Sequence, residues 1–244
     1  MVSLYERAAA ACASSCPAAL PELWAAYSSF VSRHRSRLSP VLQRLLDAKS
    51  SLSVLVRALL QCDTAGVLQA RLYVCLLRDY ERAQEEDAIS NARVRSAVEK
   101  GVHMAPTPDY ALQVANALVD WHARRYRAST TEDGKAACRD DARETVRLLG
   151  RVMSCGYGEA GREAQRAMVL HGARLEYEVF CDRAEGARLA RSAATRQPVR
   201  ASDWLVYAAL ERGYRGEDEE KNTERCRQVY EQALQAVQST EDLG

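Results

Sequence analysis

Eight cysteines and four histidines are the residues best able to bind a metal ion, but their spacing argues against a metal site. No two cysteines form the C-x-x-C pair that is typical of zinc sites and redox-active disulfides. Cys12 and Cys16 are four residues apart and can share one helix face, but the four histidines are too scattered to complete a site with them. We therefore predict no metal and no cofactor. Cys75, Cys181 and Cys226 lie in apolar stripes, as buried, reduced thiols of an intracellular protein do.

A second chemical candidate is the cluster of Gly156, Gly158 and Gly161. A phosphate-binding loop would follow a strand and precede a Lys-Ser/Thr pair, and neither signal is present. The cluster therefore predicts a loop between helices. Catalysis would need a nucleophile beside a base, paired carboxylates or a set of metal ligands, and none occurs with suitable spacing. We predict that the chain is not an enzyme.

Arginine runs are the remaining candidates for a binding site. The candidate RNA or partner contacts are Arg33, Arg35, Arg37, Arg124, Arg125 and Arg127. Arginines at helix ends can instead simply cap backbone carbonyls, which is the alternative interpretation. The chain carries 34 basic and 33 acidic side chains, a net charge of +1, so no overall charge draws it to nucleic acid or to a membrane.

The elements that must position these side chains are helices. Gly (12), Pro (6) and Phe (2) are scarce, while Ala, Leu, Arg and Glu dominate, which favours helices over sheets. No run of 18 apolar residues occurs, so we predict no membrane span. The alanine-rich stretch at residues 8–13 lacks the basic start of a signal peptide.

The clearest helical pattern is a hairpin near the C-terminus. Trp204, Tyr207 and Glu211 are spaced three and four apart and share one face of a first helix. The second helix is predicted to bury one apolar face, made of Cys226, Val229, Tyr230, Ala233, Leu234 and Val237. Gly213, Gly216 and the polar residues 217–222 separate the two helices. One hairpin cannot bury both stripes alone, so the pattern predicts neighbours of the same kind.

Parts of this pattern recur along the chain. Trp24 and Tyr27 repeat the spacing of Trp204 and Tyr207, and Arg188 lies 39 residues before Arg227. The other matching positions are Tyr5, Glu6 and Ala8, then Arg95 and Glu99, and then Glu176.

Apolar periodicity predicts helices over residues 2–13, 22–34, 39–46, 52–62, 66–82, 88–104, 109–126, 136–154 and 162–181, ahead of the final hairpin. Pro17 and Pro21 are expected to bound a loop, and residues 128–135 to form a polar linker. The predicted fold is all-α, an α-α superhelix of about five to six hairpins that forms one domain over residues 1–244. The alternative is a helical bundle without repeats.

The hairpin resembles the HAT (half-a-TPR) repeat, whose first helix carries W-x-x-Y-x-x-x-E and whose second carries R-x-x-Y-E-x-A. The matching residues are Trp204, Tyr207, Glu211, Arg227, Tyr230, Glu231 and Ala233. Short segments at residues 4–8, 21–24, 98–101 and 203–207 follow the order found in the HAT region of the U4/U6 snRNP recycling factors. This resemblance covers nearly the whole chain, but no RNA-recognition motif accompanies it.

The resemblance implies a non-enzymatic nuclear scaffold for pre-mRNA splicing, acting in U4/U6 snRNP assembly or recycling. Its expected partners are other RNA-processing proteins and a second copy of itself in a homodimer, with RNA contacted only indirectly. The chain is then expected to be part of a longer array. HAT scaffolds of mRNA 3′-end cleavage and polyadenylation, crooked-neck proteins and U1-associated splicing factors remain alternatives, as does direct RNA binding through the arginine runs.

The signature residues are expected to be structural. The Trp and Tyr of a first helix should fill the space between their own second helix and the next repeat, where burial of each stabilises the fold by about 2 to 3 kcal/mol. Small residues such as Ala8 and Ala233 should allow helices to approach closely. The signature Glu and Arg are expected to pair across the hairpin.

Overall fold

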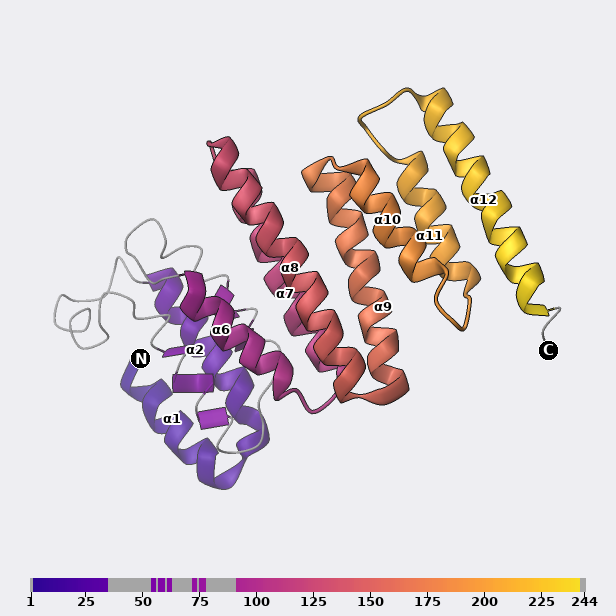
Figure 1. Cartoon of the computed structure of the whole chain (residues 1–244). Helices are drawn as coiled ribbons and strands as arrows, with labels where there is room; N and C mark the ends of the chain where they lie inside the picture. Colours follow the sequence, from indigo (N-terminus) through magenta and orange to yellow (C-terminus); the bar gives the residue numbers. More distant parts are fainter. Residues whose placement is uncertain are drawn as a thin grey trace. The chain divides into compact units, whose positions relative to one another are not determined.

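Every regular element that the structure describes is a helix (Figure 1). The computed structural model describes residues 2–34 and 91–241, with short pieces at 54–55, 57–59, 61–62, 72–73 and 75–77 between them. The chain divides into two compact units, Met1–Pro106 and Thr107–Gly244. Over the described residues, the all-α prediction is confirmed.

The first unit contains the helices α1 (Val2–Ser15), α2 (Leu20–His34) and α6 (Asn91–His103), with a short 3₁₀ turn, η1 (Pro17–Ala19), between the first two. Tyr5 of α1 stacks on Tyr27 of α2 with ring centroids 4.9 Å apart. The Tyr27 hydroxyl donates to Glu6 at 2.9 Å, and Arg57 donates to both oxygens of the same carboxylate. These contacts join α1, α2 and the residue 57 region around one acidic side chain.

Trp24 of α2 is also tied to a distant part of the first unit. Its indole nitrogen donates to Gln61 at 2.9 Å, and the Arg57 guanidinium lies 5.5 Å from its ring centroid. In α6, Gly101 faces the ring of Tyr73, because a Cβ built on the glycine would come within 2.4 Å of that ring. A glycine is therefore required where this tyrosine contacts the helix.

The described residues of the second unit form six helices and one π-helical turn. These are α7 (Pro108–Ala128), α8 (Glu132–Gly156), α9 (Gly158–Leu175), the π turn η3 (Glu176–Phe180), α10 (Arg183–Ala194), α11 (Ala201–Arg212) and α12 (Glu219–Glu241). Each helix packs on the next in chain order, and α7 and α11 also contact α9 (Figure 1). Consecutive helices run in opposite directions, so the helices can be grouped into the antiparallel pairs α7–α8, α9–α10 and α11–α12.

Buried positions recur at the same register in the three first helices. Val169, Gly172 and Glu176 lie 35 residues before Trp204, Tyr207 and Glu211, and all six are buried. The same buried register in α7 is Ala115, Leu118 and His122, which lie 54 residues before the α9 set. The polar member of each set is almost fully enclosed: His122 is 1%, Glu176 2% and Glu211 1% exposed.

The three second helices share a different feature. Each carries an arginine that pairs with a glutamate three residues earlier: Glu144–Arg147 in α8 at 2.7 Å, Glu185–Arg188 in α10 at 2.5 Å and Glu224–Arg227 in α12 at 3.1 Å. Arg147 lies 41 residues before Arg188, and Arg188 lies 39 residues before Arg227. The first helices therefore share one buried register and the second helices share one ion pair, although the spacing between successive copies differs.

Several predicted helix boundaries were wrong. The loop expected between Pro17 and Pro21 is helical, because proline is tolerated in the first turn of a helix, where its missing N–H needs no partner. The polar linker expected over residues 128–135 shrinks to residues 129–131. The Thr131 side chain accepts from the Gly134 backbone at 3.2 Å and caps α8, whose first turn is acidic.

The glycine-rich loop was predicted too long. Only Tyr157 separates α8 from α9; Gly158, at φ +59°, makes the turn and Gly161 lies inside α9. The helix predicted over residues 39–46 lies outside the described residues. The described residues within 52–62 and 66–82 are all helical.

Candidate docking groove

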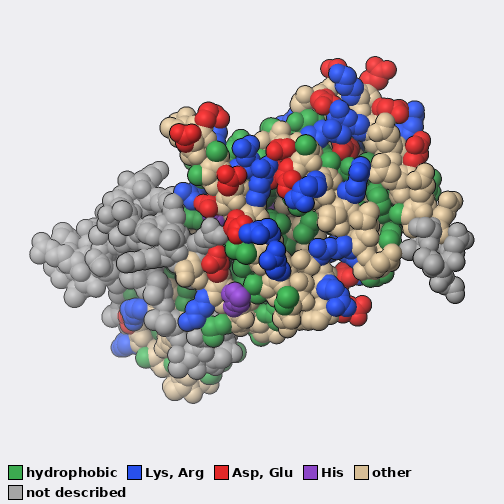
Figure 2. All heavy atoms as spheres, in the orientation of Figure 1, with side chains coloured by type: hydrophobic (Ala, Val, Ile, Leu, Met, Phe, Trp, Pro, Cys, Tyr) green, Lys and Arg blue, Asp and Glu red, His purple; other side chains and the backbone are tan. Residues whose placement is uncertain are grey.

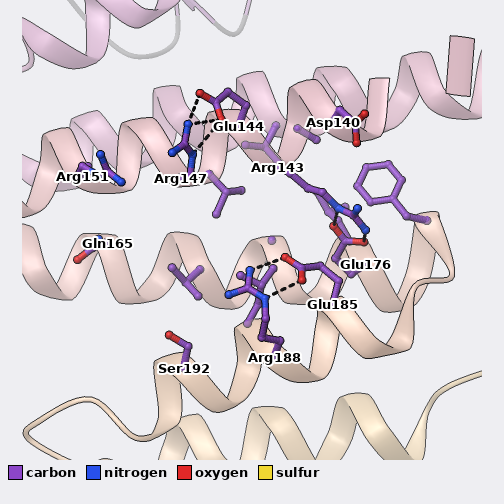
Figure 3. A pocket seen from close by; sticks show the side chains of 18 of the residues that line it. Asp140, Arg143, Glu144, Arg147, Arg151, Gln165, Glu176, Glu185, Arg188 and Ser192 are labelled. Atoms are coloured by element: carbon purple, nitrogen blue, oxygen red, sulfur yellow. Dashed lines mark hydrogen bonds and ion pairs between the residues drawn. The ribbon is translucent and has the colours of Figure 1, made fainter. Parts of the chain in front are cut away.

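Helices α8, α9 and α10 enclose a groove of about 500 Å³, the α8–α10 groove (Figure 3). Its floor is aliphatic and includes Val146, Val169 and Leu189. Its volume lies within the range of pockets that hold small ligands or a few residues of a peptide. The groove is therefore large enough to be a candidate binding site.

The walls of the groove are charged. On α10, Arg188 and Ser192 are four residues apart and share one face that lines the groove, and Arg196 lines it just after the end of that helix. On α8, Arg147 and Arg151 have the same spacing on the opposite wall. On the face drawn in Figure 2, arginine and carboxylate side chains are interspersed along these helices, with apolar side chains between them.

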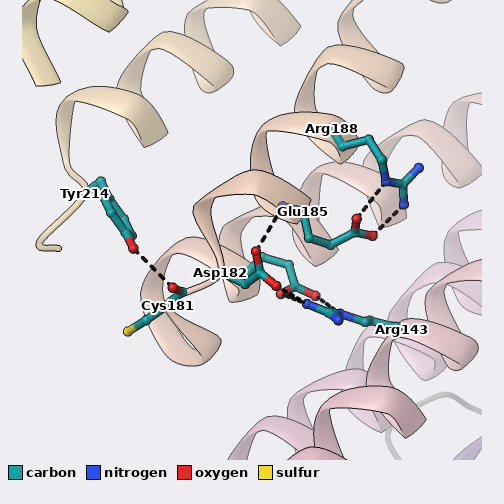
Figure 4. Close-up of polar contacts among 7 residues, drawn as sticks. Arg143, Cys181, Asp182, Glu185, Arg188 and Tyr214 are labelled. Atoms are coloured by element: carbon teal, nitrogen blue, oxygen red, sulfur yellow. Dashed lines mark hydrogen bonds and ion pairs between the residues drawn. The ribbon is translucent and has the colours of Figure 1, made fainter. Parts of the chain in front are cut away.

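A network of ion pairs lies at the Glu176 end of the groove (Figure 4). Arg143 of α8 donates to both oxygens of Glu176, at 2.7 and 2.8 Å, and to Asp182 at 2.8 Å. Asp182 also accepts from the backbone N–H of Glu185 at 3.1 Å and so caps α10. Glu185 in turn holds Arg188, so the network links α8 to the first turn of α10.

Burial and pairing act in opposite directions on these carboxyl groups. Burial raises the pKa of Glu176, and Arg143 offsets only part of that rise. The backbone N–H of Glu185, followed by Arg143, holds the pKa of Asp182 below its usual value. Glu176 in turn raises the pKa of Arg143. Arg143 therefore counteracts the effect of burial on the charged form of Glu176.

A second ion pair repeats this arrangement one hairpin later. Arg183 of α10 donates to Glu211 of α11 at 2.8 Å, as Arg143 of α8 does to Glu176 at the end of α9. In both cases, the second helix of one hairpin is bound to the first-helix glutamate of the next. Burial raises the pKa of the adjacent Tyr177, and the Glu211 carboxylate raises it further.

Small residues stand at the signature positions beside the α8–α10 groove. Trp204 and Tyr207 belong to the apolar cluster between α9, α10, α11 and α12. The corresponding residues one hairpin earlier are Val169 and Gly172, both of which line the groove. A Cβ on Gly172 would already come within 3.1 Å of Val146, so this glycine allows α8 and α9 to approach closely.

The structure places Trp204, Tyr207 and Glu211 on one buried face, as the spacing predicts. The two aromatic rings pack on their own second helix, α12, as expected, and their other neighbours belong to the preceding hairpin. The expected Glu–Arg pair across the hairpin was wrong. Glu211 binds Arg183, and Arg227 binds Glu224 within its own helix.

The buried face of α12 differs from the predicted one. Cys226 and Val229 are buried, but Tyr230 is 47% and Leu234 63% exposed. Two apolar stripes lie side by side on this helix, and the stripe that continues to Ala233 and Ala236 is the one packed against the cluster around Trp204. Periodicity identifies both stripes and cannot choose between them.

The other signature residues are spread over both units. Trp24 and Tyr27 are buried, Tyr5, Glu6, Ala8 and Glu99 are half-buried, and Arg188 and Glu231 are exposed. Arg95 lies in α6.

Two arginines of the predicted binding runs make contacts within the fold. Arg33 donates to the Ser29 carbonyl of its own helix at 3.2 Å. The Arg125 guanidinium lies 4.7 Å from the ring centroid of Trp121, a fully buried residue that the sequence pattern did not single out. Arg124 and Arg127 are exposed, whereas Arg35 and Arg37 lie outside the described residues.

Sequence reasoning missed most residues of the groove. The missed charged residues are Asp140, Arg143, Glu144, Arg147, Arg151, Glu185 and Arg196. The recurrence of Glu-x-x-Arg in three helices is a signal that could have revealed some of them. The choice of Arg143 as the partner of Glu176 has no sequence signal, since 33 residues separate them.

Within the described ranges, no cluster of three or more His, Cys, Asp or Glu side chains is arranged to hold a metal ion. None of the helices searched in those ranges is long and apolar enough to span a membrane. In comparisons with known proteins, no protein-family model and no curated protein sequence matches this chain.

Proposed function

We propose that this protein is a non-enzymatic scaffold of the HAT type that docks other proteins of an RNA-processing complex in the nucleus. Pre-mRNA splicing is the proposed process, with U4/U6 snRNP assembly or recycling as the step. The proposed architecture is an α-α superhelix of stacked hairpins. The resemblance of the hairpin at residues 204–233 to the HAT repeat supports the proposed family, and the α8–α10 groove supports a docking role.

The observation that carries the proposal is the repeated connection between successive hairpins. Arg143 binds Glu176 and Arg183 binds Glu211, each from the second helix of one hairpin to the first helix of the next. An array built in this way is held by nearest-neighbour contacts and presents extended side faces, which suits a scaffold. Three helix pairs with one buried register support such an array over residues 107–241.

The test is an affinity purification of the tagged full chain from nuclear extract, with the bound proteins identified by mass spectrometry. We expect splicing proteins, including U4/U6 components, to be enriched over the tag alone and over polyadenylation factors. Enrichment of 3′-end cleavage factors instead would move the protein to the alternative HAT complex. Recovery of neither group would contradict a role in RNA processing.

Self-association is part of the proposal. Exposed apolar side chains on the last hairpin, Leu205, Tyr230 and Leu234, provide a surface that a second copy can cover. Multi-angle light scattering of the purified chain should give the mass of a dimer at tens of micromolar. A monomer mass at that concentration would contradict self-association but not the docking of other proteins.

Direct RNA binding is the second candidate function. Arg127, Arg215 and Tyr214 line another pocket of about 440 Å³, which combines cations with an aromatic ring. Cations that neutralise phosphates and rings that stack on bases are typical of single-strand RNA sites. Retardation of a uridine oligonucleotide that weakens with salt and is lost in Arg127→Glu/Arg215→Glu would favour this function, and no retardation at 50 mM salt would exclude it.

A further inference from the structure

We propose that the α8–α10 groove is the docking site for an acidic peptide segment of a partner protein. This inference rests on the proposed scaffold function and names the chemistry that the scaffold recognises. The peptide would place carboxylates beside Arg151 and Arg196 and apolar side chains on the floor formed by Val146, Val169 and Leu189.

The charge balance inside the groove favours an acidic occupant at one end. Five arginines and four carboxylates line it, and three of the arginines bind a groove carboxylate: Arg143 with Glu176, Arg147 with Glu144 and Arg188 with Glu185. Of the two other arginines, Arg196 donates to the neutral Gln165 at 2.6 Å. Arg151 is exposed, and no carboxylate among the described residues is paired with it.

The fourth carboxylate does not neutralise this pair of arginines, because it lies at the opposite end of the groove. Asp140 and Arg151 are eleven residues apart on α8, which corresponds to about 16 Å along the helix axis, and Figure 3 shows them at opposite ends. The groove is therefore electrically polarised. Its Arg151 end attracts anions, whereas its Asp140 end does not.

The Arg151 end also offers hydrogen bonds that a peptide can use. Ser192 is exposed on α10, four residues before Arg196, and Gln165 of α9 lies beside the Arg196 guanidinium. A carboxylate that entered here would meet Arg151 and Arg196, the two groove arginines that no carboxylate neutralises. Such charge-assisted hydrogen bonds are stronger than those between neutral groups.

The lining favours a peptide over RNA. Single-stranded RNA is held mainly by exposed aromatic rings that stack on the bases. Among the described residues that line this groove, Phe180 is the sole aromatic, and it is only 5% exposed. An aliphatic floor between charged walls instead matches a segment in which acidic and aliphatic residues alternate.

The first test is selection from a random 12-residue peptide library displayed on phage, with the full chain as bait. We expect the selected peptides to be enriched in Asp and Glu next to Leu, Ile or Val. One selected peptide is then synthesised with a fluorescent label, and its dissociation constant is measured by anisotropy. A selection that yields no binders, or binders without acidic residues, overturns the proposal.

The second test measures the same peptide against charge-reversal variants. Arg151→Glu/Arg196→Glu should weaken binding by roughly tenfold or more, since two attractive contacts become repulsive. The matched control is Arg162→Glu, an exposed arginine of α9 that does not line the groove. Its affinity should stay within twofold of the wild type, and equal losses in both variants would refute the assigned site.

A gain-of-function variant keeps the proposal testable if the double reversal fails to fold. Ser192→Arg adds a third cation between Arg188 and Arg196 on an exposed position and should tighten binding of the acidic peptide about threefold at low salt. The tightening should disappear at 0.5 M salt. No change at low salt would overturn the proposal, as would displacement of the peptide by a uridine 12-mer at lower concentration than the unlabelled peptide.

The same variants separate this inference from the proposed function. If Arg151→Glu/Arg196→Glu still recovers the splicing proteins in the affinity purification, the scaffold function stands and the groove is not its docking site. If the wild type binds acidic peptides but recovers no RNA-processing protein, the groove is confirmed as a peptide site and the assignment to RNA processing is wrong.

Discussion

Replacing Arg143 by methionine should destabilise the second unit strongly and in a pH-dependent way. Arg143 is 29% exposed, but its partner Glu176 is only 2% exposed, so the substitution leaves a buried carboxylate without its counter-ion. Breaking a buried pair in this way costs about 3 to 5 kcal/mol. Because water reaches the Arg143 side of the pair, we expect about 2 to 3 kcal/mol at pH 7.

The pH dependence follows from the raised pKa of Glu176. A carboxyl group whose pKa is higher in the folded chain than its unfolded value of about 4.3 binds its proton more tightly in the folded state. Its protonation therefore favours folding, and this contribution is lost as the pH rises through the folded pKa. Without Arg143 the pKa of Glu176 should rise further, so the variant should lose less stability at pH 5 than at pH 7.

Asp182 should not obscure this difference. Its pKa is lowered, so the stability it contributes is present above its unfolded pKa and is lost only as the pH falls through the folded pKa. The carboxylate therefore stays ionised between pH 5 and pH 7, and the pH dependence in that window reports on Glu176.

The assay is urea unfolding followed by circular dichroism at 222 nm, at both pH values, for the wild type and the variants. The matched control is Glu176→Gln, which removes the buried charge while keeping the shape and should cost only about 1 kcal/mol. A cost for Arg143→Met below about 1 kcal/mol at pH 7 would refute the reasoning. An equal cost at pH 5 and pH 7, or a larger cost for Glu176→Gln, would refute it too.

Three further predictions follow from burial and packing. Gly161→Ala should cost about 2 kcal/mol or more in urea unfolding, because its Cβ would lie 2.1 Å from the Met153 carbonyl oxygen, while Gly156→Ala, which meets nothing within 4 Å, should be neutral or slightly stabilising. Trp204→Ala should lower stability by about 3 to 5 kcal/mol, whereas Tyr230→Ala, at an exposed position, should change it by less than about 0.5 kcal/mol; similar losses would mean that Tyr230 is buried. Alkylation mapped by mass spectrometry should modify the exposed cysteines first and the buried ones only on unfolding: Cys16, Cys155 and Cys181 before Cys62, Cys138 and Cys226. Burial raises the pKa of Cys62 to about 11, which keeps its thiol protonated and unreactive at pH 8, and early alkylation of Cys62 would contradict this.

Sequence reasoning predicted the helices of the second unit well, and their ends less well. The interior of α8 was predicted from Ala142, Val146 and Leu149, which are buried at helical spacing. Its start was placed four residues late, because Thr131 and the acidic residues after it were taken for a linker rather than for a cap. Helix ends depend on a few backbone hydrogen bonds, which leave a weaker pattern than an apolar stripe does.

The groove was the least predictable feature. Val169 and Gly172, which line it, stand where Trp204 and Tyr207 stand one hairpin later, and the equivalence becomes clear only when the buried registers of α9 and α11 are compared. A groove depends on how the side chains of several helices pack together, so the sequence pattern of one helix cannot predict it.

The sequence by itself determined that the chain is helical, where most helices lie and which face of α11 is buried, because periodicity and capping act within a few residues of one segment. Only the tertiary structure decided that α12 buries the stripe of Cys226 and Val229 rather than that of Tyr230 and Leu234, and that Glu211 pairs with Arg183. Those choices depend on which distant helix supplies the complementary surface and the counter-charge. Both are fixed only when the helices pack, since Arg183 and Glu211, for example, are 28 positions apart in the chain.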